Sequence, residues 1–132
     1  MRVITFGVFD YFHFGHLRLF ERCKEYGDYL IVAVQDGNEI HKTKPGVDIM
    51  YTTEQRVKLL EALKCIDKVV VYKQVEDDIK KIDFDTFIVG EDQTHSGFKK
   101  AVEYCESSGK NVIRLTRTPG ISSTLIRTKR EN

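Results

Sequence analysis

One stretch of sequence decides the fold, Gly7-Val8-Phe9-Asp10-Tyr11-Phe12-His13-Phe14-Gly15-His16. The apolar run before it, residues 3–6, predicts a buried strand, and residues 17–26 after it predict a helix. The two histidines therefore fall where a strand turns into a helix. The first backbone N–H groups of a helix have no partner inside it and lie at the positive end of its dipole, so such a turn is suited to bind phosphate.

The residue types in this turn fit a phosphate ligand. Gly15 lets a ligand approach the backbone closely because glycine has no side chain. The imidazoles of His13 and His16 add hydrogen-bond donors beside the backbone N–H groups. We therefore interpret His13-x-Gly15-His16 as the phosphate-binding turn of a nucleotidyl-transfer enzyme. Two other interpretations stay open on these residues alone: half of a zinc site, or two incidental histidines at a helix start.

Composition narrows the class of protein. A chain of 132 residues, 41% of them hydrophobic, has the length of one domain with one core. Its 21 Lys and Arg against 20 Asp and Glu give a net charge of +1, which offers no reason to expect a nucleic-acid partner. Three cysteines without CxxC spacing suit a reducing cytoplasm and form no zinc framework. We expect no signal peptide, because the sequence begins directly with a predicted strand, and no membrane helix, because no apolar run approaches the roughly 20 residues that a span needs.

The alternation of strands and helices predicts the architecture. Further strands are expected over residues 28–34, 67–72, 84–89 and 111–115, and further helices over residues 53–63, 75–82, 98–107 and from Ser122. Residues 36–50, with two glycines and a proline, are expected to form a long loop. The pattern predicts an α/β, Rossmann-like, doubly wound sheet of about five parallel strands with helices on both faces, in a single domain over residues 1–132.

In such a sheet, ligands bind beyond the carboxyl ends of the strands, where the strand order reverses. Four groups of chemically useful residues follow predicted strands, namely residues 9–16, the group His41, Lys42 and Lys44, the run Gly90-Glu91-Asp92, and residues 117–124. Lysines can close over a triphosphate as point charges, and an arginine offers a fork of donors for phosphate. The four groups therefore predict one anion-binding site at one edge of the sheet.

Two motifs resemble the signatures of the HxGH nucleotidyltransferase superfamily. The first is Gly7-Val8-Phe9-Asp10 with His13-Phe14-Gly15-His16. The second is Arg117-Thr118-Pro119-Gly120-Ile121-Ser122-Ser123-Thr124-Leu125-Ile126, which is similar to the Arg-Thr-x-Gly-Ile-Ser-Thr-Thr-x-Ile pattern of the superfamily's cytidylyltransferases. Both stand in the expected order, nearly the whole chain apart. The sequence most resembles the bacterial glycerol-3-phosphate cytidylyltransferase group, over residues 3–128.

The resemblance implies a CTP-dependent enzyme that transfers CMP to a small phosphorylated acceptor, releases pyrophosphate and makes a CDP-activated product for surface polymers. It implies Mg²⁺ held mainly by phosphates rather than by a protein metal site. It also implies a homodimer. The aromatic residues near the first helix are candidates for its interface, namely Tyr11, Phe12, Phe14 and Phe20. The residues implied as catalytic are His13, His16, Lys42 and Arg117. Those implied to bind the nucleotide are these four with Val8, Phe9, Gly15, Lys44, Arg56, Asp92, Thr118, Ile121, Ser122, Ser123 and Thr124. Asp10 is expected to hold the loop.

The sequence departs from this group in the half that binds the acceptor. The group carries a tryptophan and a lysine after the third strand and Gly-Asp-Asp-Trp after the fourth, whereas this chain contains no tryptophan. The acceptor is therefore expected to be glycerol 3-phosphate-like or another small phosphorylated alcohol, amine or amino acid. Candidate acceptor contacts are Tyr72, Lys73, Gln93, Thr94 and His95. Two alternatives remain: an adenylyltransferase of the same superfamily, and a non-catalytic nucleotide-binding module.

Overall fold

The computed structural model describes residues 1–10, 13–46 and 48–116. The strands are β1 Arg2–Gly7, β2 Tyr29–Gln35, β3 Lys68–Tyr72, β4 Thr86–Gly90 and β5 Asn111–Leu115. The helices are α1 Phe14–Lys24, α2 Gly37–Thr43, α3 Thr53–Glu61, α4 Val75–Asp78 and α5 Ser96–Ser107, and the 3₁₀ turn η1 Ile79–Lys81 follows α4 directly. The predicted strands are all confirmed, with bounds that differ by at most two residues.

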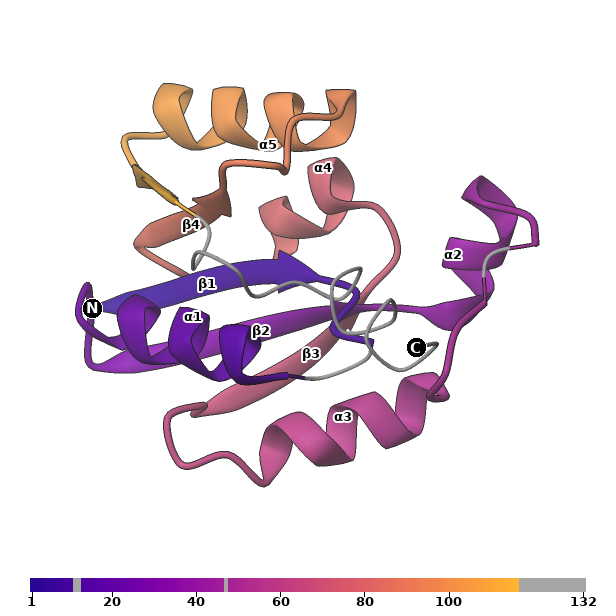
Figure 1. The fold of residues 1–132 in the computed structure, drawn as a ribbon. Coiled ribbons are helices and arrows are strands. Elements are labelled where there is room, and N and C mark those ends of the chain that lie inside the picture. The colour runs from indigo at the N-terminus through magenta and orange to yellow at the C-terminus, as the bar shows by residue number, and fades with distance from the viewer. Residues whose placement is uncertain (11–12, 47, 117–132) are drawn as a thin grey trace.

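The strands form one parallel sheet in the order β3-β2-β1-β4-β5. The chain first builds outward from β1 to β2 and β3, and then returns to place β4 on the other side of β1. The strand order therefore reverses between β1 and β4, which is the position where doubly wound sheets bind ligands. Because the strands are parallel, their carboxyl ends lie along one edge of the sheet, and the strands run from left to right in Figure 1. The predicted fold class is confirmed.

Helices cover both faces of the sheet, and two hydrophobic clusters result (Figure 1). Side chains alternate along a strand, so β1 sends Ile4 and Phe6 to one face and Val3 to the other. Ile4 and Phe6 pack in the cluster that α4 and α5 cover. Val3 packs in the cluster that α1 covers with Phe20 and Cys23 and α3 covers with Leu60. Phe20 is fully buried, so the expectation that it feeds a dimer interface is wrong.

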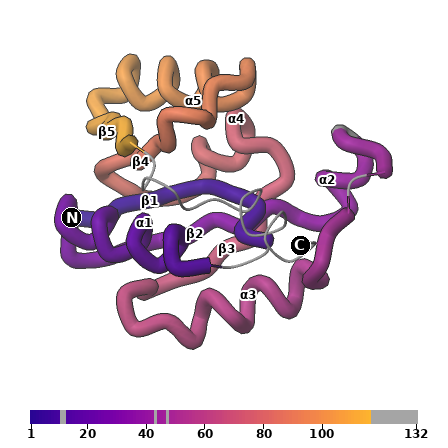
Figure 2. Tube along the Cα trace, viewed as in Figure 1, coloured from indigo at the N-terminus to yellow at the C-terminus, as the bar shows by residue number. Residues whose placement is uncertain are grey.

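The expected loop over residues 36–50 is wrong in its first half, because it contains α2. The Asp36 side chain caps this helix by accepting from the Asn38 N–H at 2.9 Å. The helix has seven residues and buries Ile40. It therefore lacks the repeated apolar stripe by which longer helices are recognised. In Figures 1 and 2 it stands away from the layers that cover the sheet.

Helix starts follow their caps. The predicted capping box of Thr52 and Gln55 opens α3. By contrast α1 begins at Phe14, three residues before the predicted start, because His13 serves as its N-cap. The short predicted helix over residues 75–82 is one α-helical turn continued by η1. The helix predicted from Ser122 lies outside the described residues.

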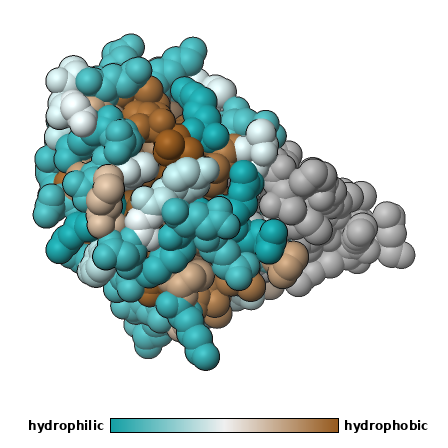
Figure 3. All heavy atoms as spheres, turned by 90° about the vertical axis from the view of Figure 1, so that its left-hand side faces the viewer, coloured by the Kyte–Doolittle hydropathy of each residue, from teal (hydrophilic) through white to brown (hydrophobic). Residues whose placement is uncertain are grey.

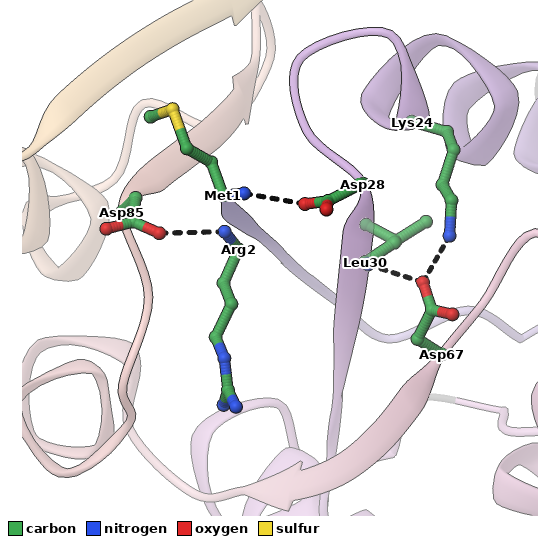
Figure 4. Close-up of polar contacts among 7 residues, drawn as sticks. All are labelled: Met1, Arg2, Lys24, Asp28, Leu30, Asp67 and Asp85. Carbon is green, nitrogen blue, oxygen red and sulfur yellow. Dashed lines mark hydrogen bonds and ion pairs between the residues drawn. The ribbon is translucent and has the colours of Figure 1, made fainter.

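Charged residues tie together the amino ends of the strands (Figure 4). Asp67 accepts from the Leu30 N–H at 2.7 Å and pairs with Lys24, and the Arg2 N–H donates to Asp85 at 2.8 Å. Burial raises the pKa of Asp67, but the bonds from Lys24 and Leu30 outweigh it and hold the pKa below its usual value. This side of the molecule is mostly hydrophilic (Figure 3). Within the described ranges, no helix combines the length and the hydropathy that a membrane span requires.

Candidate active site

A strained turn follows β1 and shapes the site. Phe9 has a φ of +53°, a left-handed conformation that costs a bulky residue about 1–3 kcal/mol. Its ring is buried and packs edge-on against His16 and Phe20, with centroids 5.6 and 5.2 Å away. A Cβ on Gly7 would lie 2.7 Å from this ring, so only glycine leaves room for it. Gly7 therefore makes room for the Phe9 ring, and the Phe9 ring in turn packs against His16.

The two histidines form the cap of α1. His13 Nδ1 accepts from the Gly15 N–H at 3.0 Å, and His16 Nδ1 accepts from the His13 N–H at 3.3 Å. The rings stack with centroids 4.0 Å apart. In a neutral imidazole one nitrogen donates and the other accepts, so both histidines carry their proton on Nε2. The cap thus sets the tautomer of both rings.

The same cap changes which groups can hold a phosphate. The sequence predicts that the backbone N–H groups of this turn are unpaired and can bind phosphate. However, the Gly15 N–H donates to His13 Nδ1, and the His16 N–H donates to the His13 carbonyl at 3.0 Å. Both are engaged because the capping box satisfies the first turn of α1. The expectation for these two N–H groups is corrected, and the donors that the geometry supports are the imidazole Nε2–H groups.

The environment keeps both imidazoles neutral. Burial, together with a smaller effect of the neighbouring His13, lowers the pKa of His16 to about 4. Burial also lowers the pKa of His13, which is less enclosed. At neutral pH the pair therefore offers two N–H donors without a net charge on either imidazole.

The low pKa of His16 makes stability depend on pH. Below its ordinary pKa of about 6.5, the imidazole is protonated in the unfolded chain while the folded chain resists protonation down to about pH 4. The free energy of unfolding should fall across this window, by about 3 kcal/mol at pH 4. Urea unfolding of the native chain and of His16→Gln between pH 7 and 4 measures it. Glutamine keeps the capping bond and does not titrate, so equal slopes in the two proteins would contradict the prediction.

Hydrogen bonds made by Asp10 and Arg56 hold the turn after β1 to neighbouring segments. The Asp10 carboxylate accepts from the Met50 and Tyr51 N–H groups at 2.6 and 3.0 Å, so the expectation that Asp10 holds the loop is confirmed. Arg56 is 1% exposed, and its Nη1 donates to the carbonyls of Val8 and Gln35, both at 2.8 Å. The chain ends of β1 and β2 are therefore joined to α3 through one guanidinium.

Two further donors of Arg56 are also engaged within the protein. Nε donates to the Tyr51 carbonyl at 3.4 Å and Nη2 to Thr53 Oγ1 at 3.3 Å. Burial lowers the pKa of this guanidinium, and the carboxylates of Asp10 and Asp36 oppose that shift. A charge on a helix gives no sign of such burial in sequence. The structure therefore shows a bracing role that sequence reasoning missed.

Lys42 and Lys44 lie on and just after α2, at the carboxyl end of β2. Both are exposed. Lys42 Nζ lies 3.8 Å from Glu39 Oε2, and the Lys44 N–H caps the helix by donating to the Ile40 carbonyl at 2.8 Å. The Gly37 N–H donates to Thr53 Oγ1 at 2.8 Å, which ties α2 to the start of α3. The lysines therefore follow β2 on the same edge of the sheet as the histidines.

The candidate acceptor residues separate into two groups. Tyr72 is buried in the core against Phe6, at 4.9 Å between ring centroids, and burial raises the pKa of its phenol. Gln93 spans the reversal point, because its Nε2 donates to the Phe6 carbonyl at 2.7 Å and its Oε1 accepts from the Gly90 N–H at 2.9 Å. These two side chains serve the framework of the sheet in this structure.

The other candidates face solvent on the carboxyl-end connections. They are Lys73, Thr94 and His95, with Asp92 exposed beside them in sequence. His95 is the N-cap of α5, and its Nδ1 accepts from the Gly97 N–H at 3.1 Å. Its proton is therefore placed on Nε2, as in His13. The second motif, with Arg117, Thr118, Ile121, Ser122, Ser123 and Thr124, lies outside the described residues.

Comparison with known proteins identifies the family. A family model described as cytidylyltransferase-like matches residues 4–129. The chain belongs to the cytidylyltransferase-like family. It is 41% identical over 131 residues to the glycerol-3-phosphate cytidylyltransferase of Staphylococcus aureus, covering 96% of this chain and 92% of the relative. The FAD synthase of Archaeoglobus profundus is 37% identical over 120 residues, covering 87% of this chain and 74% of the relative.

Solved structures agree on the fold. A lipopolysaccharide core biosynthesis protein from Thermoplasma volcanium superposes with a TM-score of 0.73 at 22% identity, over 89% of this chain and 96% of that chain. The predicted family is thus confirmed, and this cytidylyltransferase-like protein is a nucleotidyltransferase. Among the residues that the structure describes, no three His, Cys, Asp or Glu side chains gather as a metal site.

Proposed function

We propose that the chain is a CTP-dependent cytidylyltransferase that transfers CMP to a small phosphorylated acceptor. A phosphate oxygen of the acceptor attacks the α-phosphorus of CTP. The bond from that phosphorus to the bridging oxygen breaks, and pyrophosphate leaves with the electron pair. The observation that carries the proposal is the pair of neutral histidines capping α1, whose Nε2–H donors lie at the carboxyl-end edge beside the reversal of strand order.

The chemistry asks for charge stabilisation more than for covalent catalysis. In the proposal His13 and His16 donate to phosphate oxygens as negative charge grows on the leaving group. Lys42 and Lys44 contribute positive charge from α2. The second motif completes the nucleotide site, with Arg117 as the guanidinium fork and Thr118, Ile121, Ser122, Ser123 and Thr124 around the phosphates. Val8, Phe9, Gly15 and Asp92 complete the proposed nucleotide contacts.

Mg²⁺ is part of the proposal as a partner of CTP. When bound, it would neutralise charge on the triphosphate. The described residues supply no carboxylate cluster for it, which is compatible with an ion held mainly by phosphate oxygens and water. The protein's own contribution is then to hold the phosphates with histidine and lysine donors.

We propose that the acceptor lies beyond the reversal point, near Lys73, Thr94 and His95. Lysine and imidazole donors suit a phosphate, and all three residues are exposed on connections at the carboxyl edge. The relatives named glycerol-3-phosphate cytidylyltransferase support a glycerol phosphate-like molecule. The absence of the tryptophans that the glycerol-3-phosphate group carries after its third and fourth strands favours a different acceptor, namely another phosphorylated alcohol, amine or amino acid. The CDP-activated product would be a precursor for the synthesis of surface polymers. We place the protein itself in the cytoplasm, because three free thiols suit a reducing compartment.

Pyrophosphate release across a grid of substrates tests the function. One axis holds CTP, ATP, GTP and UTP, and the other holds glycerol 3-phosphate, phosphocholine, phosphoethanolamine, sugar-alcohol phosphates and phosphorylated amino acids, all with Mg²⁺. We expect release with CTP and one acceptor. Release with ATP alone would instead support an adenylyltransferase, an alternative favoured by the FAD synthase relatives. CTP binding by calorimetry without release over the whole grid would indicate a binding module.

A homodimer is also proposed. Phe14 and Met50 are 61% and 46% exposed. They lie beside the turn after β1, since Phe14 follows the His13 cap and the Met50 N–H is bound by Asp10. Exposed apolar residues of this size suit a contact with a second copy. Light scattering should give twice the chain mass of 15.3 kDa, and Phe14→Ser should lower it.

A further inference from the structure

The helix that carries the phosphate-binding lysines is weakly supported by its own sequence. α2 has seven residues, fewer than an isolated helix needs to be stable in water. It stands clear of the helices that cover the sheet (Figure 2). Its orientation must therefore depend on a few tertiary contacts, and the placement of Lys42 and Lys44 depends on the same contacts.

The Glu39 carboxylate makes one of these contacts, and it joins α2 to the connection after β3. The Glu39 side chain is 15% exposed, and its Oε1 accepts from Gln74 Nε2 at 2.5 Å. Its Oε2 lies 3.8 Å from Lys42 Nζ, whose side chain is 74% exposed. A hydrogen bond to a charged acceptor is stronger than one between neutral groups. Glu39 therefore joins α2 and its lysine to the connection that follows β3.

That connection is a firm anchor. The Asp36 N–H donates to the Tyr72 carbonyl at 2.8 Å, and Gln35 Nε2 donates to the Lys73 carbonyl at 3.0 Å. The Lys73 N–H donates to Asp78 Oδ2 at 2.7 Å, so the backbone before Gln74 is bonded on both sides. The anchor also includes Lys73, a proposed acceptor contact. The contact between Glu39 and Gln74 thus links the nucleotide side of the site to the acceptor side.

We propose that Glu39 and Gln74 are positioning residues that fix α2, so that Lys42 and Lys44 meet the triphosphate of CTP. The inference rests on the proposed function for the identity of the ligand. Neither residue contacts the reacting atoms. The contact acts through the orientation of the helix, and its loss therefore weakens the capture of CTP more than it slows the subsequent chemistry.

The test compares Glu39→Ala, Gln74→Ala, the double variant and Glu39→Gln, with CTP kinetics as the readout. Each single alanine variant should raise the KM for CTP by about tenfold with a smaller change in kcat. The double variant should be no worse than Glu39→Ala, because Glu39→Ala already removes the contact that Gln74→Ala removes. Glu39→Gln should restore most of the loss, because glutamine still accepts from Gln74. Gln74 makes no side-chain cap bond to α4, so its replacement leaves that helix start intact.

Glu54→Ala is the matched control, since Glu54 is an exposed glutamate in the first turn of α3 that pairs with Lys58 at 3.8 Å. It should leave the KM unchanged. An unchanged KM in Glu39→Ala, an additive double variant, or a Glu39→Gln variant as weak as Glu39→Ala would each overturn the inference.

A second measurement needs no ligand. In hydrogen exchange, the Lys44 N–H should exchange faster in Glu39→Ala than in the native chain, because its bond to the Ile40 carbonyl closes α2. Unchanged exchange would overturn the inference even if the native chain used no CTP. A native chain that neither binds nor turns over CTP, with faster exchange in the variant, would overturn the proposed function while upholding the contact. The two failures are therefore distinguishable.

Discussion

Replacement of His13 or His16 by alanine should lower turnover by about 100-fold or more while the protein stays folded. Each imidazole presents an Nε2–H donor because its Nδ1 accepts a backbone N–H in the cap of α1. In the proposed reaction, alanine removes the donor from the position where charge grows on the phosphates. Steady-state pyrophosphate release measures the loss, and circular dichroism with urea unfolding checks the fold.

The cap has to be separated from the chemistry, because alanine at an N-cap also costs about 1 kcal/mol of stability. His13→Asn is the matched control, since asparagine can accept from the Gly15 N–H as His13 does. It should be as stable as the native chain and lose turnover like His13→Ala. Native activity in either alanine variant, or full recovery in His13→Asn, would contradict the role of the imidazole donor.

Replacement of Arg56 by methionine should lower the free energy of unfolding by about 3–5 kcal/mol. The side chain is fully buried, and its loss leaves the carbonyls of Val8 and Gln35 without their donor at the ends of two central strands. An unpaired buried carbonyl costs the free energy of its desolvation. Urea unfolding at pH 7 measures the difference.

Lys58→Met is the matched control for this second prediction. Lys58 lies two residues away on α3, is exposed and pairs with Glu54, so its loss should cost less than about 1 kcal/mol. Arg56→Lys keeps the charge with fewer donors and should fall between the native chain and Arg56→Met. A nucleotide contact without a bracing role would instead weaken CTP binding and leave the free energy of unfolding within 1 kcal/mol of the native value.

Much of the fold follows from patterns that are local in sequence. Continuous apolar runs between polar segments predict the five strands, because strands covered on both faces need apolar side chains at nearly every position. The capping box of Thr52 and Gln55 sets the start of α3 from four residues alone. α2 was missed because it has one buried residue and so no periodic stripe. Its stability comes from partners that are distant in sequence.

The sequence by itself determined the order of the elements, the turn with its two histidines and the family. It did so because these depend on neighbours within a few residues, or on motifs that relatives share. Only the tertiary structure decided the orientation of α2, the burial of Arg56 and the use of Gln93 as a bridge between strands. Those depend on contacts across long separations, such as the 35 residues between Glu39 and Gln74 and the 87 between Phe6 and Gln93. The sequence gives the chemical type of each side chain. The groups that surround the side chain in the fold decide its partners and its pKa.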